Sequence, residues 1–343
     1  MPDLTRFPPA SDAALIDSGY FVPHWPQPWG RAAGVAEQLV IDEELADVEQ
    51  PDLGIGTWVV LTLAQHATEE QAARWIRPAL EGDQRWCQLF SEPNAGSDAA
   101  AIATRATRAD GGWLVNGQKV WTSDAMNCSM GLATVRTDPD APKHAGVSMF
   151  AIDLRAPGVE VRPLREITGE TLFNEVFFDD VFVPDDDVVG EVGQGWIVAR
   201  ATLGNERVSI GSSDSDLDLP EADDLVALLD RYPSADGGFA RDVGALIAEE
   251  HAMRSLNLRH VMRALIGGPP GPEGNLTKLL AAEHAQRVTT LGMAIAGTAA
   301  VTGREPRLAR GYLFARCLTI AGGTSEILRT VIAERLLGLP RDR

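Results

Sequence analysis

The chain reads W-C-Q-L-F-S-E-P-N-A-G-S-D at residues 86–98 and W-L-V-N-G-Q-K-V-W-T-S at residues 113–123. Two short apolar runs end in hydroxyl residues, the first at Ser91 and the second at Ser123. The turn after the first run consists of small residues, which let backbone N–H and side-chain O–H groups approach a flat ligand. With Trp121 as a stacking surface, the two strand ends predict one wall of an aromatic cofactor pocket.

Both stretches resemble the flavin-binding signature of the acyl-CoA dehydrogenases, which use FAD. A ligand-free, serine-rich loop is the alternative for residues 89–98 alone, and V-W-T-S at 120–123 weighs against it. The resemblance implies an α+β multidomain fold. It has an N-terminal helical region (1–85), a middle antiparallel, β-barrel-like domain (86–192) and a C-terminal helical bundle (193–343). The implied FAD contacts are Gln88, Phe90, Ser91, Gly96, Ser97, Trp121, Thr122, Ser123, Thr324 and Glu326.

Composition and charge exclude several classes of protein. The chain has 343 residues, 45% of them hydrophobic and 23% charged, as expected for a globular protein. Its net charge of −19 argues against nucleic acid or an anionic membrane surface as partner. No apolar run reaches the roughly 18 residues of a membrane span, and residues 1–9 show no signal pattern. The three cysteines lack metal or redox spacing, so we expect a cytoplasmic protein without a metal site.

Local patterns predict the secondary structure of each region. Residues 68–71 (T-E-E-Q) form a capping box that opens a helix, and residues 110–112 and 116–117 are predicted hairpin turns. Residues 212–224 are predicted to be a loop, and G-G-P-P-G-P-E-G at 267–274 interrupts the helical region. Further helices are predicted at 39–48, 56–67, 195–211, 242–266, 275–301, 304–319 and 324–337, and strands at 131–136, 147–153, 159–163 and 175–183.

The resemblance also points to a catalytic base. Most acyl-CoA dehydrogenases carry a Glu directly before a G-T-S motif near the C-terminus, but in I-A-G-G-T-S-E-I that position is Gly322. A smaller group carries the base on the helix after the β domain, which corresponds to Glu206. On helical spacing Glu206 shares a face with Thr202, Leu203 and Ile210, where desolvation would raise the pKa of a carboxyl group. From the residues alone, a helical Glu turned to solvent is the alternative.

The family chemistry assigns roles to four residues. Glu206 is expected to remove the α proton of an acyl-CoA thioester, while the flavin accepts a hydride from the β carbon. The backbone N–H of Gly322 is expected to donate to the thioester oxygen. Ser97 and Arg207 are expected to contact the substrate, although for Arg207 an ion pair with an acidic helix face is an equal alternative. The expected electron acceptor is an electron-transfer flavoprotein.

Two motifs that a neighbouring subunit supplies in homo-oligomeric family members are missing. In place of the R-x-x-F-G arginine, which binds the pyrophosphate, the chain has R-Y-P-S at 231–234 and G-G-F-A-R at 237–241. In place of a Gln followed by L-G-G, it has A-I-A-G-T at 294–298. Residues 1–30 are also short and Pro-rich, which would leave the substrate side less covered. We therefore expect a hetero-oligomer with a related chain, as in actinobacterial heterotetramers acting on bulky steroid side-chain thioesters.

Three functions follow from these observations. The first is an active dehydrogenase with Glu206 as base. The second is a non-catalytic subunit that binds flavin or a partner, for which Glu206→Gln would leave the activity of the complex unchanged. The third is a flavin oxidase or monooxygenase on the same fold, which would consume oxygen without an electron-transfer protein. The presence of both Glu206 and the flavin-ring motifs favours the first.

Overall fold

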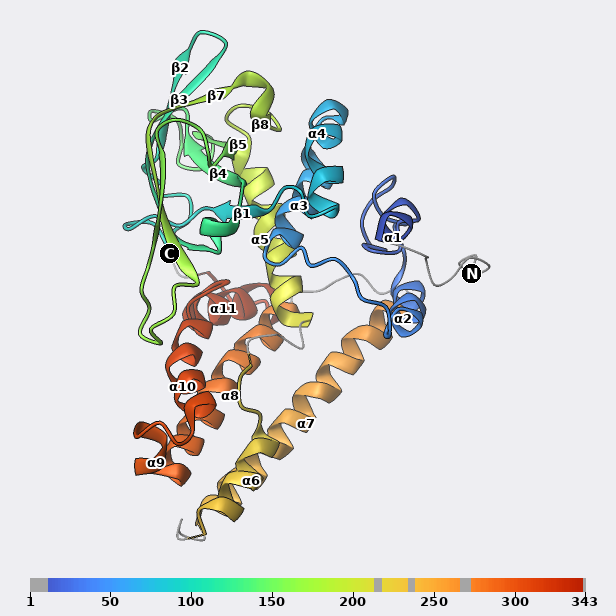
Figure 1. Cartoon of the computed structure of the whole chain (residues 1–343), viewed down its shortest axis with the longest axis vertical. Coiled ribbons are helices and arrows are strands. Elements are labelled where there is room, and N and C mark those ends of the chain that lie inside the picture. The colour runs from blue at the N-terminus through green and yellow to red at the C-terminus, as the bar shows by residue number, and fades with distance from the viewer. Residues whose placement is uncertain (1–11, 213–217, 234–237, 266–272, 342–343) are drawn as a thin grey trace. The chain divides into compact units, whose positions relative to one another are not determined.

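The structure is a computed structural model that describes residues 12–212, 218–233, 238–265 and 273–341 (Figure 1). The chain divides into two compact units, Met1–Asn205 and Glu206–Arg343, and each is described by itself. The boundaries at residues 85 and 192 that the resemblance implies stay a prediction. Among the described residues, no helix has the length and apolar character needed to cross a membrane.

The first unit begins with helices. They are α1 (Asp12–Asp17), α2 (Val35–Glu44), α3 (Gly56–His66) and α4 (Glu69–Leu80). The predicted capping box is confirmed, since the Thr68 hydroxyl accepts from the Gln71 N–H and the Gln71 side chain accepts from the Thr68 N–H. Gln71 also donates to the carbonyl of Val188 at 2.7 Å. Gln71 therefore both caps the start of α4 and connects this helix to the sheet by a hydrogen bond.

An eight-stranded sheet forms the middle of the first unit, in the order β6-β7-β3-β2-β4-β5-β8 with β1 paired to β4. Five strand pairs are antiparallel, but β1–β4 and the short β2–β4 contact are parallel. The expectation of antiparallel pairing is therefore wrong for these two pairs, because the chain crosses through β2 and β3 before it returns beside β1. The strands are β1 (Trp86–Leu89), β2 (Arg105–Ala109), β3 (Gly112–Ser123), β4 (Met130–Arg136), β5 (Val147–Asp153), β6 (Val159–Pro163), β7 (Phe173–Pro184) and β8 (Val188–Val189).

The two predicted hairpin turns have different outcomes. The turn at 110–112 is confirmed, with Gly111 at φ +72° between β2 and β3. The prediction of a turn at 116–117 is wrong, because β3 continues through both residues. The register of β3 with β7 shifts at this point. The Asn116 amide donates to the Asp180 carboxylate at 2.8 Å. A Cβ on Gly117 would lie 2.5 Å from the Thr104 hydroxyl, so glycine serves close backbone approach there.

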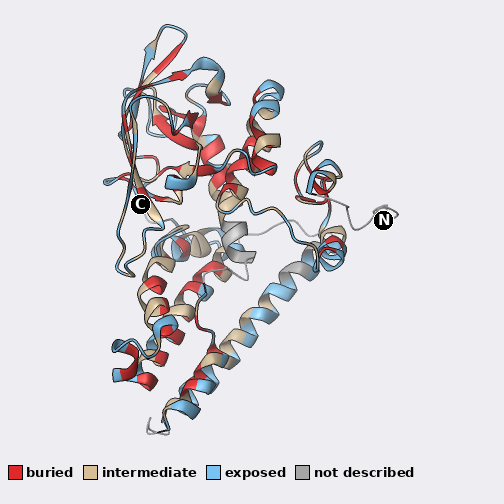
Figure 2. Ribbon diagram, in the orientation of Figure 1, coloured by how far each residue is buried: buried red, intermediate tan, exposed pale blue. Residues whose placement is uncertain are grey.

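Two apolar clusters include residues of the sheet, whose buried residues are red in Figure 2. One joins α3 and α4 to the sheet and contains the fully buried Leu63, Ile76 and Trp86. The other lies among the strands and includes Phe150 and Val176, both 0% exposed. Burial of such side chains stabilises the fold by about 1.5–3 kcal/mol each. The strand ends that carry the candidate site are therefore attached to a rigid support.

The second unit is helical. Helix α5 (Gly195–Ser212) crosses the boundary between the units, and residues 213–217 of the predicted loop lie outside the described residues. Helix α6 was not predicted, and its capping box joins Glu221 to Asp224. The single helix predicted at 275–301 is split by Gly297 at φ +55°. The helices are α6 (Ala222–Arg231), α7 (Gly238–Leu265), α8 (Glu273–Ala296), α9 (Thr298–Val301), α10 (Pro306–Leu318) and α11 (Ser325–Val331), followed by a π-helical turn at Ile332–Leu336. The combination of a sheet and a helical region agrees with the predicted α+β fold.

Candidate active site

The two stretches singled out in the sequence meet in the first unit. The N–H of Val120 donates to the carbonyl of Ser91 at 2.9 Å, which joins the chain after β1 to the end of β3. Ser91 and Ser123 are both half-buried. Gly96 and Ser97 lie in the loop that follows β1 and are exposed. The tertiary structure therefore places the end of the first stretch beside the end of the second.

Trp121 has an unusual backbone conformation at the end of β3. Its φ is +60°, and the pairing of β3 with β7 is irregular between Lys119 and Thr122. A non-glycine residue in the left-handed region is uncommon and clusters at ligand sites. Trp121 is 60% exposed, and its ring centroid lies 6.0 Å from that of Phe173 in an edge-to-face arrangement. A large exposed ring held by strained backbone suits stacking against a flat cofactor.

Polar groups beside Trp121 also fit a ligand with a polar edge. The hydroxyl of Thr122 is buried and has no hydrogen-bond partner among the residues that the structure describes. Gln88 is oriented by Trp58, whose indole N–H donates to its side-chain oxygen at 2.8 Å. The ring of Phe90 is only 5% exposed and belongs to the apolar core. Phe90 thus supports the wall from behind, while Thr122 offers an unsatisfied polar atom.

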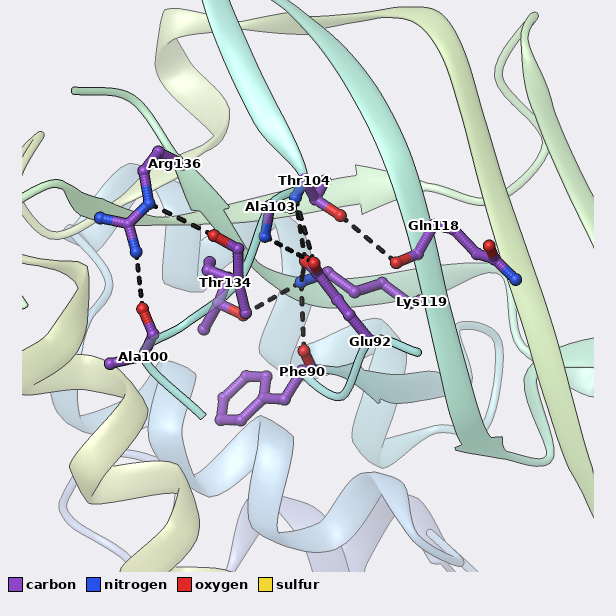
Figure 3. A network of polar contacts seen from close by, with 10 residues as sticks. Phe90, Glu92, Ala100, Ala103, Thr104, Gln118, Lys119, Thr134 and Arg136 are labelled. Atoms are coloured by element: carbon purple, nitrogen blue, oxygen red, sulfur yellow. Dashed lines mark hydrogen bonds and ion pairs between the residues drawn. The ribbon is translucent and has the colours of Figure 1, made fainter. Parts of the chain in front are cut away.

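A buried ion pair that the sequence analysis did not single out joins the two flavin-like stretches (Figure 3). Lys119 is 0% and Glu92 7% exposed. The ammonium of Lys119 donates to the Glu92 carboxylate at 2.8 Å and to the carbonyl of Phe90 at 3.1 Å. The same carboxylate accepts from the N–H groups of Ala103 at 2.6 Å and Thr104 at 3.0 Å. This network connects the segment after β1 with β3 and with the start of β2.

Burial and charge shift the pKa values of the pair. Burial lowers the pKa of Lys119 to about 8, although the Glu92 carboxylate opposes this. Burial raises the pKa of Glu92, but the charge and hydrogen bond of Lys119, with the N–H groups of Ala103 and Thr104, together bring it below its usual value. The sequence held a partial signal, since Lys119 is the only charged residue of the second flavin-like stretch and the first stretch carries the acidic residues Glu92 and Asp98.

Removing one member of this pair is expected to destabilise the protein strongly. Glu92→Ala leaves the Lys119 ammonium buried without its counter-charge, which typically costs about 3–5 kcal/mol. The matched control is Glu160→Ala, because Glu160 forms an exposed pair with Arg162, and exposed pairs contribute about 0–1 kcal/mol. Urea unfolding followed by tryptophan fluorescence measures both variants, and equal losses would contradict the prediction.

The same pair predicts a pH dependence. The pKa of Glu92 is lower in the folded protein than its unfolded value of 4.5. The ionised carboxylate therefore contributes its full stabilisation of the folded state above about pH 4.5. This stabilisation is lost as the pH falls through the folded pKa. The difference in unfolding midpoint between wild type and Glu92→Ala is therefore expected to shrink at low pH.

The second unit carries the other predicted site residues on the turn between α10 and α11. Gly322 and Gly323 have φ values of +64° and +100°. The hydroxyl of Thr324 accepts from the N–H of Ile327 at 3.2 Å, so it caps α11. Among the described residues, the backbone N–H of Gly322 has no hydrogen-bond partner. Glu326 is exposed in the first turn of α11. The turn thus presents a half-buried N–H group that is available to a ligand.

Helix α5 carries the candidate base. Thr202 is 0% exposed and donates to the carbonyl of Val198 at 2.9 Å, and Leu203 and Glu206 are half-buried. The alternative interpretation required Glu206 to be turned to solvent, but its side chain is only partly exposed. The side chains of Arg207 and Ile210 lie outside the described residues.

Two models of known protein families match this chain. The family model of the acyl-CoA dehydrogenase middle domain matches residues 87–181, and that of the acyl-CoA dehydrogenase C-terminal domain matches residues 193–337. The chain belongs to the acyl-CoA dehydrogenase family. The first of these matches contains residues 87–98 of the first flavin-like stretch and all of the second stretch, and the second match contains Glu206 and the turn at Gly322.

Individual members of the acyl-CoA dehydrogenase family are similar over almost the whole chain. Acyl-CoA dehydrogenase FadE34 of Mycobacterium tuberculosis is 49% identical over 96% of this chain, which spans 46% of the length of that relative. Acyl-CoA dehydrogenase IpdE1 of Mycolicibacterium smegmatis is 36% identical over 93% of this chain and 84% of its own length.

Two solved structures have the same fold as this chain. The Tcur3481-Tcur3483 steroid ACAD is 26% identical with a TM-score of 0.76, covering 96% of this chain and 88% of that chain. The ChsE4-ChsE5 complex from Mycobacterium tuberculosis is 26% identical with a TM-score of 0.76, covering 96% and 89%. Both similarities confirm the predicted acyl-CoA dehydrogenase fold.

Proposed function

We propose that the chain is a subunit of an FAD-dependent acyl-CoA dehydrogenase that introduces an α,β double bond into an acyl-CoA thioester. The observation that carries this proposal is the exposed, left-handed Trp121 on the wall formed by the ends of β1 and β3. When bound, FAD supplies the redox chemistry by accepting the hydride lost from the β carbon. Gln88, Ser91, Trp121, Thr122 and Ser123 would hold its ring.

Glu206 is proposed to take the α proton, because the usual base position is occupied by Gly322. A Glu at that position would need a φ near +64°, which is strained for a residue with a side chain. The N–H of Gly322, which has no partner among the residues that the structure describes, would instead donate to the thioester oxygen and stabilise the enolate-like charge that develops on it. Ser97 and Arg207 are proposed to contact the acyl-CoA.

The active form is proposed to be a hetero-oligomer with a related chain. In support, the two solved structures, Tcur3481-Tcur3483 and ChsE4-ChsE5, are each named for two polypeptides. In this chain Arg231, one replacement for the missing pyrophosphate arginine, is paired with Glu305 at 2.6 Å. Because Tcur3481-Tcur3483 is a steroid ACAD, we propose that the substrate of this chain also has a bulky acyl group. An electron-transfer flavoprotein is the proposed acceptor.

Flavin binding tests the proposed wall. The double variant Ser91→Ala, Trp121→Ala is expected to lower the affinity for FAD by about 10- to 100-fold, because it removes the stacking ring and a hydroxyl from one side of the cofactor. Phe182→Ala is the control, since Phe182 is also a large exposed aromatic, at 47%, on β7. Quenching of flavin fluorescence during titration measures the affinity of each assembled variant. No flavin absorbance in the fully assembled wild type would reject the proposal.

A further inference from the structure

A buried lysine of α8 holds the turn that carries Gly322. Lys278 is 5% exposed, and its ammonium donates to the carbonyl of Leu318 at 2.9 Å and to the carbonyl of Gly323 at 2.8 Å. Leu318 is the last residue of α10, and Gly323 lies just before the cap of α11. One side chain therefore joins the two ends of the turn, from a position 40 and 45 residues earlier in the chain.

Burial of this ammonium has a cost that a packing role does not require. Transfer of a charged group out of water is unfavourable unless hydrogen bonds compensate, whereas a Met of similar length would fill the same space without that cost. The carbonyl of Leu318 carries the partial negative charge of a helix C-terminus, which stabilises a nearby cation. The hydrogen bonds to the carbonyl groups of the turn therefore offset part of this cost.

The turn itself is made of residues with little conformational preference. Gly322 and Gly323 both have positive φ, and glycine reaches many other conformations at similar energy. A second side chain of α8 restrains the same region, since the Gln286 amide donates to the carbonyl of Ala315 at 3.1 Å and to the Thr319 hydroxyl at 2.9 Å. The direction of the Gly322 N–H therefore depends on contacts from α8.

We propose that Lys278 is a positioning residue that orients the backbone N–H of Gly322 toward the carbonyl oxygen of the acyl-CoA thioester. This inference rests on the proposed function, in which that N–H stabilises the developing negative charge. Lys278 acts through the turn and does not contact the substrate. Stabilisation of this kind requires the donor to be aligned before the reaction, because donors that must reorganise lose much of their effect.

The test uses Lys278→Met in the flavin-loaded complex. The probe is the 3-oxo derivative of an acyl-CoA that the complex oxidises, because its α carbon ionises to an enolate whose absorbance can be titrated. We expect the pKa of the bound probe to rise by about one unit, which is a tenfold loss of preference for the enolate. We also expect kcat to fall about 10- to 100-fold with little change in KM. Flavin content should stay at the wild-type value.

The control is Thr277→Val, which removes a hydrogen bond to Asn257 from the neighbouring residue of α8 and should leave the probe pKa unchanged. If Lys278→Met does not fold, Gln286→Leu removes the second restraint and should shift the probe pKa in the same direction by a smaller amount. An unchanged probe pKa and kcat in a folded Lys278 or Gln286 variant would overturn the inference. So would a loss of kcat that only parallels a loss of flavin.

The same complex separates this inference from the proposed function. If Glu206→Gln abolishes turnover while Lys278→Met leaves the probe pKa and kcat unchanged, the function stands and the inference fails. If Glu206→Gln and Lys278→Met both leave turnover unchanged, the proposal that this chain is the catalytic subunit is rejected, and the inference that rests on it is rejected as well.

Discussion

Glu206→Gln is expected to reduce kcat of the flavin-loaded complex by about 10²- to 10⁴-fold, the usual contribution of a general base. The amide keeps the size of the half-buried carboxyl group but cannot take the α proton. KM should change little, because binding of the thioester does not depend on proton transfer. Steady-state turnover with an artificial electron acceptor measures the effect, and flavin content should match that of wild type.

A matched control keeps this result specific. Glu44→Gln makes the same chemical change at an exposed position of α2 and should leave turnover within about twofold. A near-normal rate for Glu206→Gln would place the base on the partner chain and favour a non-catalytic role for this subunit. Oxygen consumption by the wild-type complex without an electron-transfer protein would instead favour an oxidase.

Co-expression with a related acyl-CoA dehydrogenase-like chain is expected to raise flavin content from near zero to one FAD per heterodimer. An isologous homodimer would repeat the same deficiency in both sites, because neither copy carries the R-x-x-F-G arginine for the pyrophosphate. A bidentate arginine from the partner would supply the missing charge-assisted hydrogen bonds. Mass in solution and the ratio of flavin absorbance to protein measure the outcome.

Two variants sharpen this experiment. Replacing the partner's R-x-x-F-G arginine with Ala should return flavin content to that of the single chain. Arg231→Ala should have no such effect, because Arg231 is already engaged by the Glu305 carboxylate, which also accepts from the Tyr232 hydroxyl at 2.7 Å. A stable homo-oligomer of this chain with one FAD per copy and full activity would contradict the prediction, and would show that its own basic residues bind the pyrophosphate.

Features that depend on neighbouring residues were predictable from the sequence. The capping box at Thr68 needs only two side chains three residues apart, and the strands at 147–153 and 159–163 follow from local β-forming patterns. The flavin-like stretches are continuous segments, so their resemblance to the family could be read directly. The Asn116–Gly117 turn failed because its dipeptide signal is local, while the contact that uses Gly117 comes from Thr104 on another segment.

The sequence alone thus established the family resemblance, the replacement of the usual base by Gly322 and the candidate base Glu206. Only the tertiary structure revealed the left-handed bulge at Trp121, the Glu92–Lys119 pair and the restraint of the glycine turn by Lys278. Glu92 and Lys119 are 27 residues apart, and Lys278 lies 40 and 45 residues before the two carbonyl groups that it binds. The charges of Glu92, Lys119 and Lys278 are buried because folding brings compensating polar groups to them from distant segments. A pattern of neighbouring residues does not predict such contacts.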